Sequence, residues 1–134
     1  MERAEVSKDN KYWIEKHRFY ELKHFCRQYR YWKKVISNID AVTSRPIGEK
    51  VDTSGYSDPT PKTVFIREAY VSKIKLVERI AHETDPLIGD YILKGVTEGK
   101  SFDILNANET IPCSRDEYYK LYRKFFWLLH KARG

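Results

Sequence analysis

The sequence predicts an all-α protein. Apolar residues recur at three- and four-residue spacings over most of its 134 residues, no stretch of convincing length alternates apolar and polar residues as a strand does, and Ser or Thr precedes several periodic segments, where it can cap a helix. We expect an N-terminal aromatic-rich helical arm over residues 1–44, a Pro/Gly-rich linker or loop over 45–62, and a C-terminal unit of several helices over 63–134.

The segment between residues 12 and 39 is expected to be helical and is crowded with aromatic side chains. Apolar residues recur in it at helical spacing, at Leu22, Phe25, Cys26 and Tyr29. The segment is either one helix or two helices with a bend near Arg30. Its aromatic residues exceed what one buried stripe requires: Tyr12, Trp13, Phe19, Tyr20, Phe25, Tyr29, Tyr31 and Trp32. We therefore expect part of this surface to pack on the rest of the domain or on a partner, and a homodimer through this helix is one form of that contact.

The stretch from residue 44 to residue 62 interrupts the helical pattern. It contains Pro46, Pro59 and Pro61, together with two glycines and several Ser, Thr and Asp residues. Because it is long for a loop inside a compact domain, we interpret it as a linker from the N-terminal arm to the C-terminal unit.

The C-terminal unit is expected to begin with a helix that Thr63 can cap and that extends to about His82. The pair Asp85-Pro86 ends this helix and starts a shorter one, since proline is tolerated in the first turn of a helix. The shorter helix is expected to end near Lys94.

A third short helix is expected after a turn that Gly95 and Gly99 bracket. Ser101 stands where it can cap this helix, and the residues that follow it keep helical spacing. A polar turn over residues 106–110 then leads toward the final helix.

The final helix opens with Ser114 as its cap. Ser114 can accept hydrogen bonds from first-turn N–H groups, and Glu117 can reach back to the N–H of Ser114. The apolar residues of the helix fall on one face: Tyr118, Leu121, Tyr122, Phe125, Leu128 and Leu129. Its basic residues point elsewhere: Arg115, Lys120, Arg123, Lys124 and Lys131. Such a helix can be held by a small core while it contacts a polyanion, although an ordinary amphipathic helix or a protein-contact helix has the same pattern.

The composition favours a folded protein with an anionic partner. Hydrophobic residues make up 41% of the chain and aromatic residues 14%, so a core can form. The net charge is +6 and the pI is about 9.2. Positive charge lies at the two ends: residues 1–44 carry ten basic and six acidic residues, 45–113 carry nine and eleven, and 114–134 carry six and two. Two basic surfaces would suit a nucleic acid backbone, and the alternative is that both are simply solvated.

Three stretches of the C-terminal unit resemble a known DNA-binding motif. They are residues 91–105 (YILKGVTEGKSFDIL), 111–117 (IPCSRDE) and 123–129 (RKFFWLL). Residues 63–133 resemble the helix-turn-helix of sigma factor region 4, and resemble even more the phage late transcription regulators of the ArpU/RinA type. Those regulators similarly combine an N-terminal helical segment, a variable spacer and a C-terminal sigma-like helix-turn-helix. The sequence departs from the motif in a longer turn before the final helix and in two acidic residues at the start of that helix.

The resemblance implies a phage-encoded, DNA-binding transcriptional regulator whose final helix enters the major groove. Arg115 is then the candidate for a bidentate contact to guanine, and Asp116 either accepts from cytosine or supports the helix N-terminus. Lys120, Arg123 and Lys124 would grip phosphates. The full set of implied DNA-binding residues is Lys100, Ser101, Ser114, Arg115, Asp116, Tyr119, Lys120, Arg123 and Lys124.

Double-stranded DNA is therefore the expected partner. Because one small module of this kind binds with modest specificity, dimerisation or help from RNA polymerase is also expected. A second function class fits the same residues: a small phage protein that binds and inhibits a host protein, such as a component of a defence system, through its aromatic N-terminal helix. The small DNA-recognition subunit of a packaging terminase is a third reading.

Other function classes find no support in the sequence. It has no Gly-rich phosphate loop, no GxSxG and no HExxH, so we do not expect an enzyme. His17 and His24 lie two helical turns apart, and His24 with Cys26 lacks the spacing of a zinc site, so we expect neither a metal nor a cofactor. Cys26 and Cys113 are interpreted as reduced thiols. With no signal peptide and no membrane span in the sequence, we expect the protein in the cytoplasm of a bacterial host cell.

Overall fold

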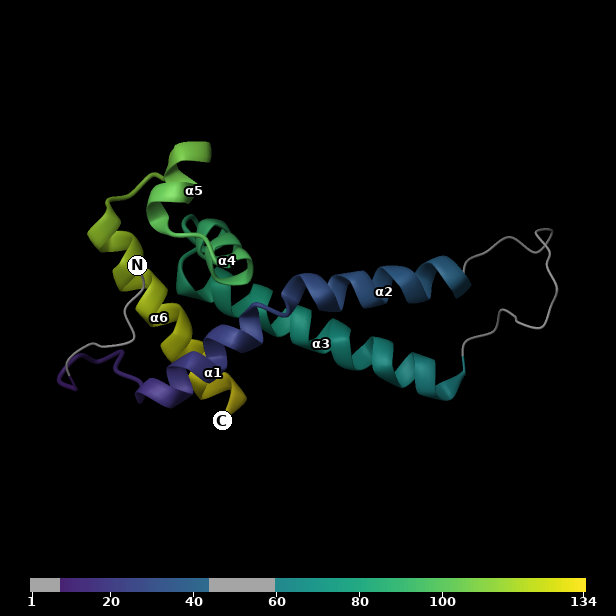
Figure 1. Cartoon of the computed structure of the whole chain (residues 1–134). Coiled ribbons are helices and arrows are strands. Elements are labelled where there is room, and N and C mark those ends of the chain that lie inside the picture. Colours follow the sequence, from purple (N-terminus) through teal and green to yellow (C-terminus); the bar gives the residue numbers. More distant parts are fainter. Residues whose placement is uncertain (1–7, 44–59) are drawn as a thin grey trace. The chain divides into compact units, whose positions relative to one another are not determined.

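The computed structural model describes residues 8–43 and 60–134, and these ranges contain six helices and no strand, which confirms the predicted all-α fold. The helices are α1 (Lys16–Cys26), α2 (Tyr29–Thr43), α3 (Pro61–Thr84), α4 (Gly89–Glu98), α5 (Phe102–Asn108) and α6 (Arg115–Arg133) (Figure 1). The described residues form two compact units. We call 8–28 with 76–134 the main unit, and 29–43 with 60–75 the hairpin unit.

The compact units do not follow the boundaries expected at residues 44 and 63. The aromatic N-terminal segment is divided between them, since α1 belongs with the C-terminal helices and α2 belongs to the hairpin unit. Helix α3 contributes to both units. Residues 45–59, most of the expected linker, lie outside the described residues.

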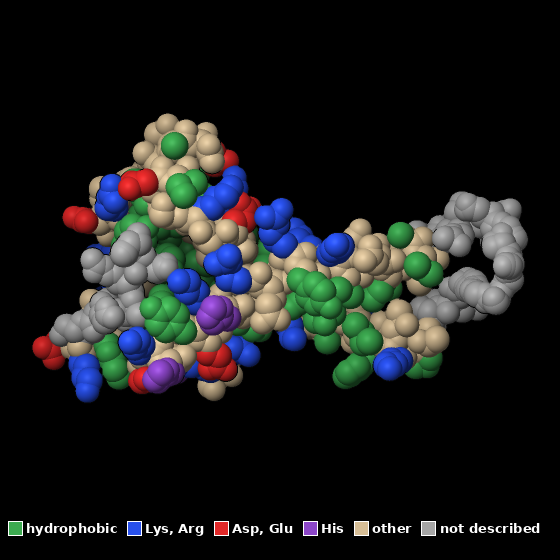
Figure 2. All heavy atoms as spheres, in the orientation of Figure 1, with side chains coloured by type: hydrophobic (Ala, Val, Ile, Leu, Met, Phe, Trp, Pro, Cys, Tyr) green, Lys and Arg blue, Asp and Glu red, His purple; other side chains and the backbone are tan. Residues whose placement is uncertain are grey.

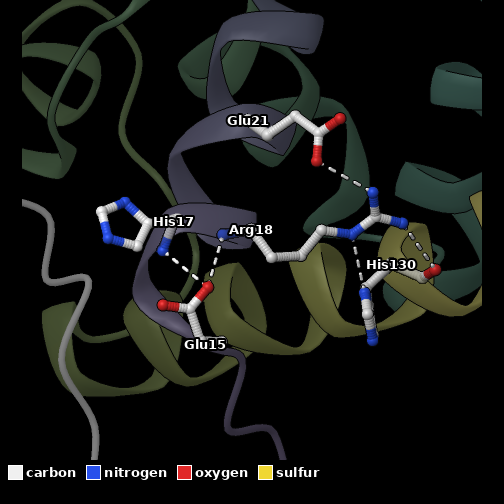
Figure 3. A network of polar contacts seen from close by, with 5 residues as sticks. All are labelled: Glu15, His17, Arg18, Glu21 and His130. Carbon is white, nitrogen blue, oxygen red and sulfur yellow. Dashed lines mark hydrogen bonds and ion pairs between the residues drawn. The ribbon is translucent and has the colours of Figure 1, made fainter.

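Helices α1 and α2 are separate, and the second begins at Tyr29, next to the bend expected near Arg30. Glu15 caps α1, because its Oε1 accepts hydrogen bonds from the backbone N–H groups of His17 at 3.0 Å and Arg18 at 3.1 Å (Figure 3). The bond from His17 is the main reason that the pKa of Glu15 lies below its ordinary value. A carboxylate at this end of α1 also interacts favourably with the helix dipole.

Helices α1, α4 and α6 pack together in the main unit, and α6 runs beside α1 (Figure 1). Phe19 of α1 lies edge-on to Phe126 of α6, with ring centroids 5.1 Å apart. The fully buried side chains of this unit include Leu22, Val77, Ile80, Ile92, Tyr118, Phe125, Phe126 and Leu129. Because these side chains come from four helices, α6 is held on one face by a closely packed core.

Helix α4 extends to Glu98, past the end predicted near Lys94. The prediction that Gly95 borders a turn is therefore wrong, since Gly95 lies inside the helix. It is buried, and its lack of a Cβ leaves room for the hydroxyl of Tyr118, which packs against it. Gly99 ends the helix in the left-handed conformation, with φ of 71°, which glycine adopts without a steric penalty.

Hydroxyl caps fix the starts of α3 and α5. Oγ1 of Thr60 accepts from the N–H of Thr63 at 3.1 Å, so Thr60, and not Thr63 as predicted, caps α3. Oγ of Ser101 accepts from the N–H of Ile104 at 3.3 Å, which confirms the predicted cap of α5. Both bonds satisfy a first-turn N–H that has no partner within its helix.

A bidentate ion pair joins the two helices of the hairpin unit. Nε and a terminal nitrogen of Arg67 on α3 lie 2.8 Å and 3.0 Å from the carboxylate oxygens of Asp40 on α2. Tyr31 and Tyr70 also meet edge to face, with ring centroids 6.2 Å apart. Several large apolar side chains of this unit remain exposed: Tyr31, Val42, Val64 and Phe65. Figure 2 shows hydrophobic side chains gathered over α2 and the adjoining part of α3.

Candidate nucleic-acid interface

Most residues that the resemblance implies for DNA contact lie on α6, and Ser114 fixes the first turn of this helix. Oγ of Ser114 accepts from the N–H of Glu117 at 3.1 Å, which confirms the predicted cap. The return bond from the N–H of Ser114 to the Glu117 carboxylate is not formed among the described residues, so half of the predicted capping box is present. The side chain of Ser114 therefore contributes one capping bond to the first turn of α6.

One face of α6 is buried in the main unit. Its buried residues are Tyr118, Tyr122, Phe125, Phe126 and Leu129. The rings of Tyr122 and Phe126 lie 5.1 Å apart, and the ring of Phe102 on α5 lies 5.3 Å from that of Tyr118. Leu121 is only half-buried, at the edge of this face. Because the aromatic face is enclosed, the opposite face of the helix is turned to solvent.

Lysines occupy that opposite face. Lys120 and Lys131 are exposed and Lys124 is half-exposed. At 100° per residue the three positions lie within roughly 40° of one another around the helix axis, so they form a single stripe, which we call the lysine row. Within the described parts of the chain, none of the three pairs with a carboxylate. The lysine row is therefore open to an anionic partner.

Trp127 lies along the lysine row and adds aromatic surface to it. The Nζ atom of Lys131 lies 4.4 Å from the centroid of the Trp127 ring, and the ring of Tyr12 lies 5.5 Å from it. These distances are those of a cation–π contact and an aromatic pair. The two contacts limit the orientations that the half-buried Trp127 side chain can adopt.

Arg115, which the resemblance implies as the guanine-reading residue, already has partners within the protein. Its guanidinium lies 2.7 Å from a carboxylate oxygen of Asp103 and 5.9 Å from the ring centroid of Phe102, both on α5. The side chains of Arg115 and Asp103 are 57% and 62% exposed, so solvent weakens this ion pair. Asp116 is exposed in the same turn, where its carboxylate interacts favourably with the helix dipole.

Tyr119 and Arg123 are half-buried and contribute to packing. The hydroxyl of Tyr119 accepts a hydrogen bond from the backbone N–H of Phe102 at 3.1 Å, which joins α6 to the start of α5. The Nε atom of Arg123 is buried and has no hydrogen-bond partner among the described residues. This N–H group of Arg123 therefore lacks the hydrogen bond that a buried donor normally makes.

Lys100 and Ser101 lie in the turn before α5. Nζ of Lys100 pairs with Glu98 at 3.1 Å, while Ser101 caps α5. With Lys23 of α1 and Arg27, which directly follows that helix, they line a cavity of about 120 Å³. No sequence pattern pointed to Lys23 or Arg27, because these two residues reach the cavity only through the packing of α1 against the turn between α4 and α5.

The residues implied by the resemblance are thus divided among three places in the main unit. Lys120 and Lys124 lie on the outer face of α6. Ser114, Arg115 and Asp116 lie at its N-terminus, where Arg115 contacts α5. Lys100, Ser101 and Tyr119 line the cavity, and Arg123 is half-buried. Lys120 and Lys124 on the outer face of α6 are cations of this set that pair with no carboxylate among the described residues, whereas Arg115 pairs with Asp103 and Lys100 with Glu98.

The cysteines and histidines provide no further site in residues 8–43 and 60–134. No group of three or more His, Cys, Asp or Glu side chains in these ranges is placed to hold a metal ion. Burial raises the pKa of the Cys26 thiol above its ordinary value, and burial also raises the pKa of Cys113. None of the helices in the same ranges is long and apolar enough to span a membrane.

Comparisons with known proteins found no relative of this chain. No protein-family model, no curated protein and no solved structure matches it. Its function is therefore inferred from its own side chains and their geometry.

Proposed function

We propose that this protein binds double-stranded DNA through the outer face of α6 and acts as a phage transcription regulator. The lysine row carries this proposal, because its three cations have no carboxylate partner within the described ranges. The opposite face of the same helix is buried in the aromatic core, which fixes the position of the lysine row. Lysines in a row neutralise neighbouring phosphates, and the counterions released from DNA supply much of the free energy of binding.

The acidic first turn of α6 determines where phosphates can bind. Asp116 and Glu117 are both exposed there and would repel a DNA backbone. Lys120 and Lys124 follow in the next two turns. We therefore assign the phosphate contacts to the lysine row and keep the N-terminus of the helix for contact with base edges.

Arg115 is the residue that we assign to base reading. To reach a guanine edge, its guanidinium must leave the carboxylate of Asp103. Because both side chains are exposed, breaking this ion pair costs little free energy. A bidentate arginine–guanine contact discriminates against other bases by about 1–3 kcal/mol. The same planar donor fork suits both acceptors, the Asp103 carboxylate and the guanine edge.

A second copy of the chain is the partner that we assign to the hairpin unit. Its described helices leave Phe65 74% exposed and Tyr31 58% exposed, and two helices are too few to enclose these side chains. Two such hairpins related by a two-fold axis would bury their apolar faces in a four-helix bundle. The dimer would present two lysine rows, which supplies the specificity that a single small module lacks.

We propose RNA polymerase as a further partner, because residues 63–133 resemble sigma factor region 4. A contact with polymerase at a promoter would raise the apparent affinity for DNA without any new contact between this protein and the duplex. Adding purified host polymerase to a promoter-binding assay tests this point, and unchanged affinity would remove polymerase from the proposal.

The salt dependence of binding to random duplex DNA tests the central proposal. For the wild type, the logarithm of the binding constant should fall linearly with the logarithm of salt concentration, and the slope should shrink by about 1 in Lys120→Ala and in Lys124→Ala. Lys75→Ala is the matched control, because Lys75 is an exposed lysine of the hairpin unit. Absence of binding even at low salt contradicts the proposal. A stable complex with a host protein would then favour the alternative, inhibition of a host protein.

Base reading requires a separate measurement with a duplex selected from a random-sequence pool. Arg115→Ala should weaken binding to the selected duplex by about 1–3 kcal/mol and relax base preference at one position. Lys124→Ala should weaken selected and random duplexes alike. If both variants lose the same affinity for every sequence, Arg115 does not read bases.

A further inference from the structure

A small cavity in the main unit brings together cations from two distant parts of the chain. Lys23 lies in the last turn of α1, Arg27 directly follows that helix, and Lys100 comes from the turn before α5. The cavity has a volume of about 120 Å³, and no acidic residue of the described chain lines it. A concave surface with three cations and no lining carboxylate concentrates positive potential and attracts an anion.

Gly99 gives Arg27 its place at this cavity. The backbone of Gly99 has a φ of 71°, and a Cβ at this position would stand 2.5 Å from the central carbon of the Arg27 guanidinium. Any other residue at position 99 would therefore displace the guanidinium as well as strain the turn. Arg27 makes no ion pair with a carboxylate among the described residues, so its planar set of donors is open to a ligand.

The two lysines of the cavity have contacts of their own. Nζ of Lys100 lies 3.1 Å from a carboxylate oxygen of Glu98, and the two side chains are 38% and 26% exposed. Nζ of Lys23 lies 5.5 Å from the ring centroid of Tyr20. The ion pair with Glu98 keeps the ammonium group of Lys100 near the turn, and an anion in the cavity would contact this ammonium group together with Glu98.

Ser101, Tyr119 and Tyr122 add hydroxyl groups to the polar lining. Oγ of Ser101 accepts from the N–H of Ile104, and the hydroxyl oxygen of Tyr119 accepts from the N–H of Phe102. A hydroxyl carries one proton of its own, so each of these groups can still donate a hydrogen bond while it accepts one. Ser101 and Tyr119 can therefore add neutral donors to the three cationic ones.

We propose that this cavity is a binding site for a phosphate group. Its volume of about 120 Å³ is enough to admit a group of the size of a phosphate. Arginine, lysine and hydroxyl donors match the acceptor oxygens of a phosphate. If the protein binds DNA as proposed above, the phosphate is one of the duplex backbone, and this part of the inference rests on the proposed function. A free phosphate or the phosphate of a small metabolite would have the same chemistry.

Titration of the full-length, isotope-labelled protein with inorganic phosphate, at constant ionic strength in chloride, tests the site by NMR. We expect saturable shifts of the amide signals of residues 95–101 and about tenfold weaker binding in Arg27→Gln, the factor that corresponds to one hydrogen bond to a charged group. Lys100→Gln is the second variant, and Arg79→Gln, which alters an exposed arginine of the same unit outside the cavity, should bind phosphate like the wild type. Shifts that do not saturate, or equal affinity in all four proteins, would overturn the proposal.

A duplex-binding assay with the same variants separates the two sources of the phosphate. A salt slope that falls by about 1 in Arg27→Gln assigns the cavity to the DNA backbone. Saturable binding of inorganic phosphate with an unchanged duplex slope assigns it to a small phosphate-bearing molecule. If the wild type binds no DNA, the proposed function fails, while the phosphate titration still decides whether the cavity is an anion site.

Discussion

Nε of Arg18 donates a hydrogen bond to Nδ1 of His130 at 2.9 Å, which joins the first turn of α1 to the last turn of α6 across 112 positions of the sequence (Figure 3). The Arg18 guanidinium also donates to the backbone carbonyl of His130 at 3.4 Å and lies 3.0 Å from Glu21. The same carbonyl accepts a hydrogen bond from the backbone N–H of Gly134 at 3.1 Å, so Arg18 adds a second donor at the C-terminal end of α6. This set of contacts helps to make the N-terminal helix part of the same compact unit as the C-terminal one.

Arg18→Ala should lower the free energy of unfolding by about 1–3 kcal/mol, because it removes hydrogen bonds of a charged group that is only 21% exposed. Urea denaturation followed by circular dichroism measures the change. Arg79→Ala is the control, since Arg79 is 56% exposed and pairs with Glu83 one turn away, and it should change stability by less than about 0.5 kcal/mol. Equal losses in the two variants would show that the contact with His130 stabilises nothing.

Gly95→Ala should destabilise the main unit by about 1–3 kcal/mol, because the added methyl group would overlap the Tyr118 hydroxyl and press on Leu105. Tyr118→Phe should be neutral or stabilising, since this buried hydroxyl has no hydrogen-bond partner among the described residues. A double-mutant cycle from denaturation curves measures the coupling, and Gly95→Ala should cost less in the Tyr118→Phe background. Additive effects would mean that the hydroxyl is not what occupies the space beside Gly95.

Asp40→Asn should weaken the hairpin unit at neutral pH and have no effect in strong acid. The hydrogen bonds from Arg67 are the main reason that the pKa of Asp40 lies below its ordinary value. With the folded-state pKa lowered, the ion pair stabilises the protein above the ordinary aspartate pKa of about 3.9, and this contribution disappears as the pH falls through the lowered value. Thermal unfolding between pH 2 and pH 7 measures it. A difference between variant and wild type that persists at pH 2 would contradict the assignment.

Phe65→Glu should shift the protein toward monomer if the hairpin unit pairs with a second copy. Placing a charge in an apolar interface should raise the dissociation constant at least about tenfold, since the carboxylate would be buried without a partner. Sedimentation velocity over a range of concentrations measures this constant. Leu87→Glu is the control, because Leu87 is 63% exposed and belongs to the main unit and not to the hairpin unit. A wild type that stays monomeric at every concentration would reject the dimer and leave α6 unaffected as a DNA-binding element.

The elements that could be predicted from the sequence are those whose causes are local. The caps at Ser101 and Ser114 each involve a bond to an N–H three residues away, and the apolar face of α6 repeats within two helical turns. The predictions at Thr63 and at Gly95 were wrong for two different reasons. Thr60 takes the cap expected at Thr63, and α4 continues through Gly95 because tertiary packing against Tyr118 outweighs the low helix propensity of glycine.

The sequence by itself determined that the protein is all-α, that a capped amphipathic helix follows Ser114, and that this helix carries cations opposite its apolar face, since periodicity and capping depend on residues within one or two turns. Only the tertiary structure decided which helices share a core. It joined Arg18 to His130, turned Arg115 toward Asp103, and brought Lys23 and Arg27 beside Lys100. Such contacts depend on how whole helix faces fit together across long stretches of chain, and no local pattern records that fit.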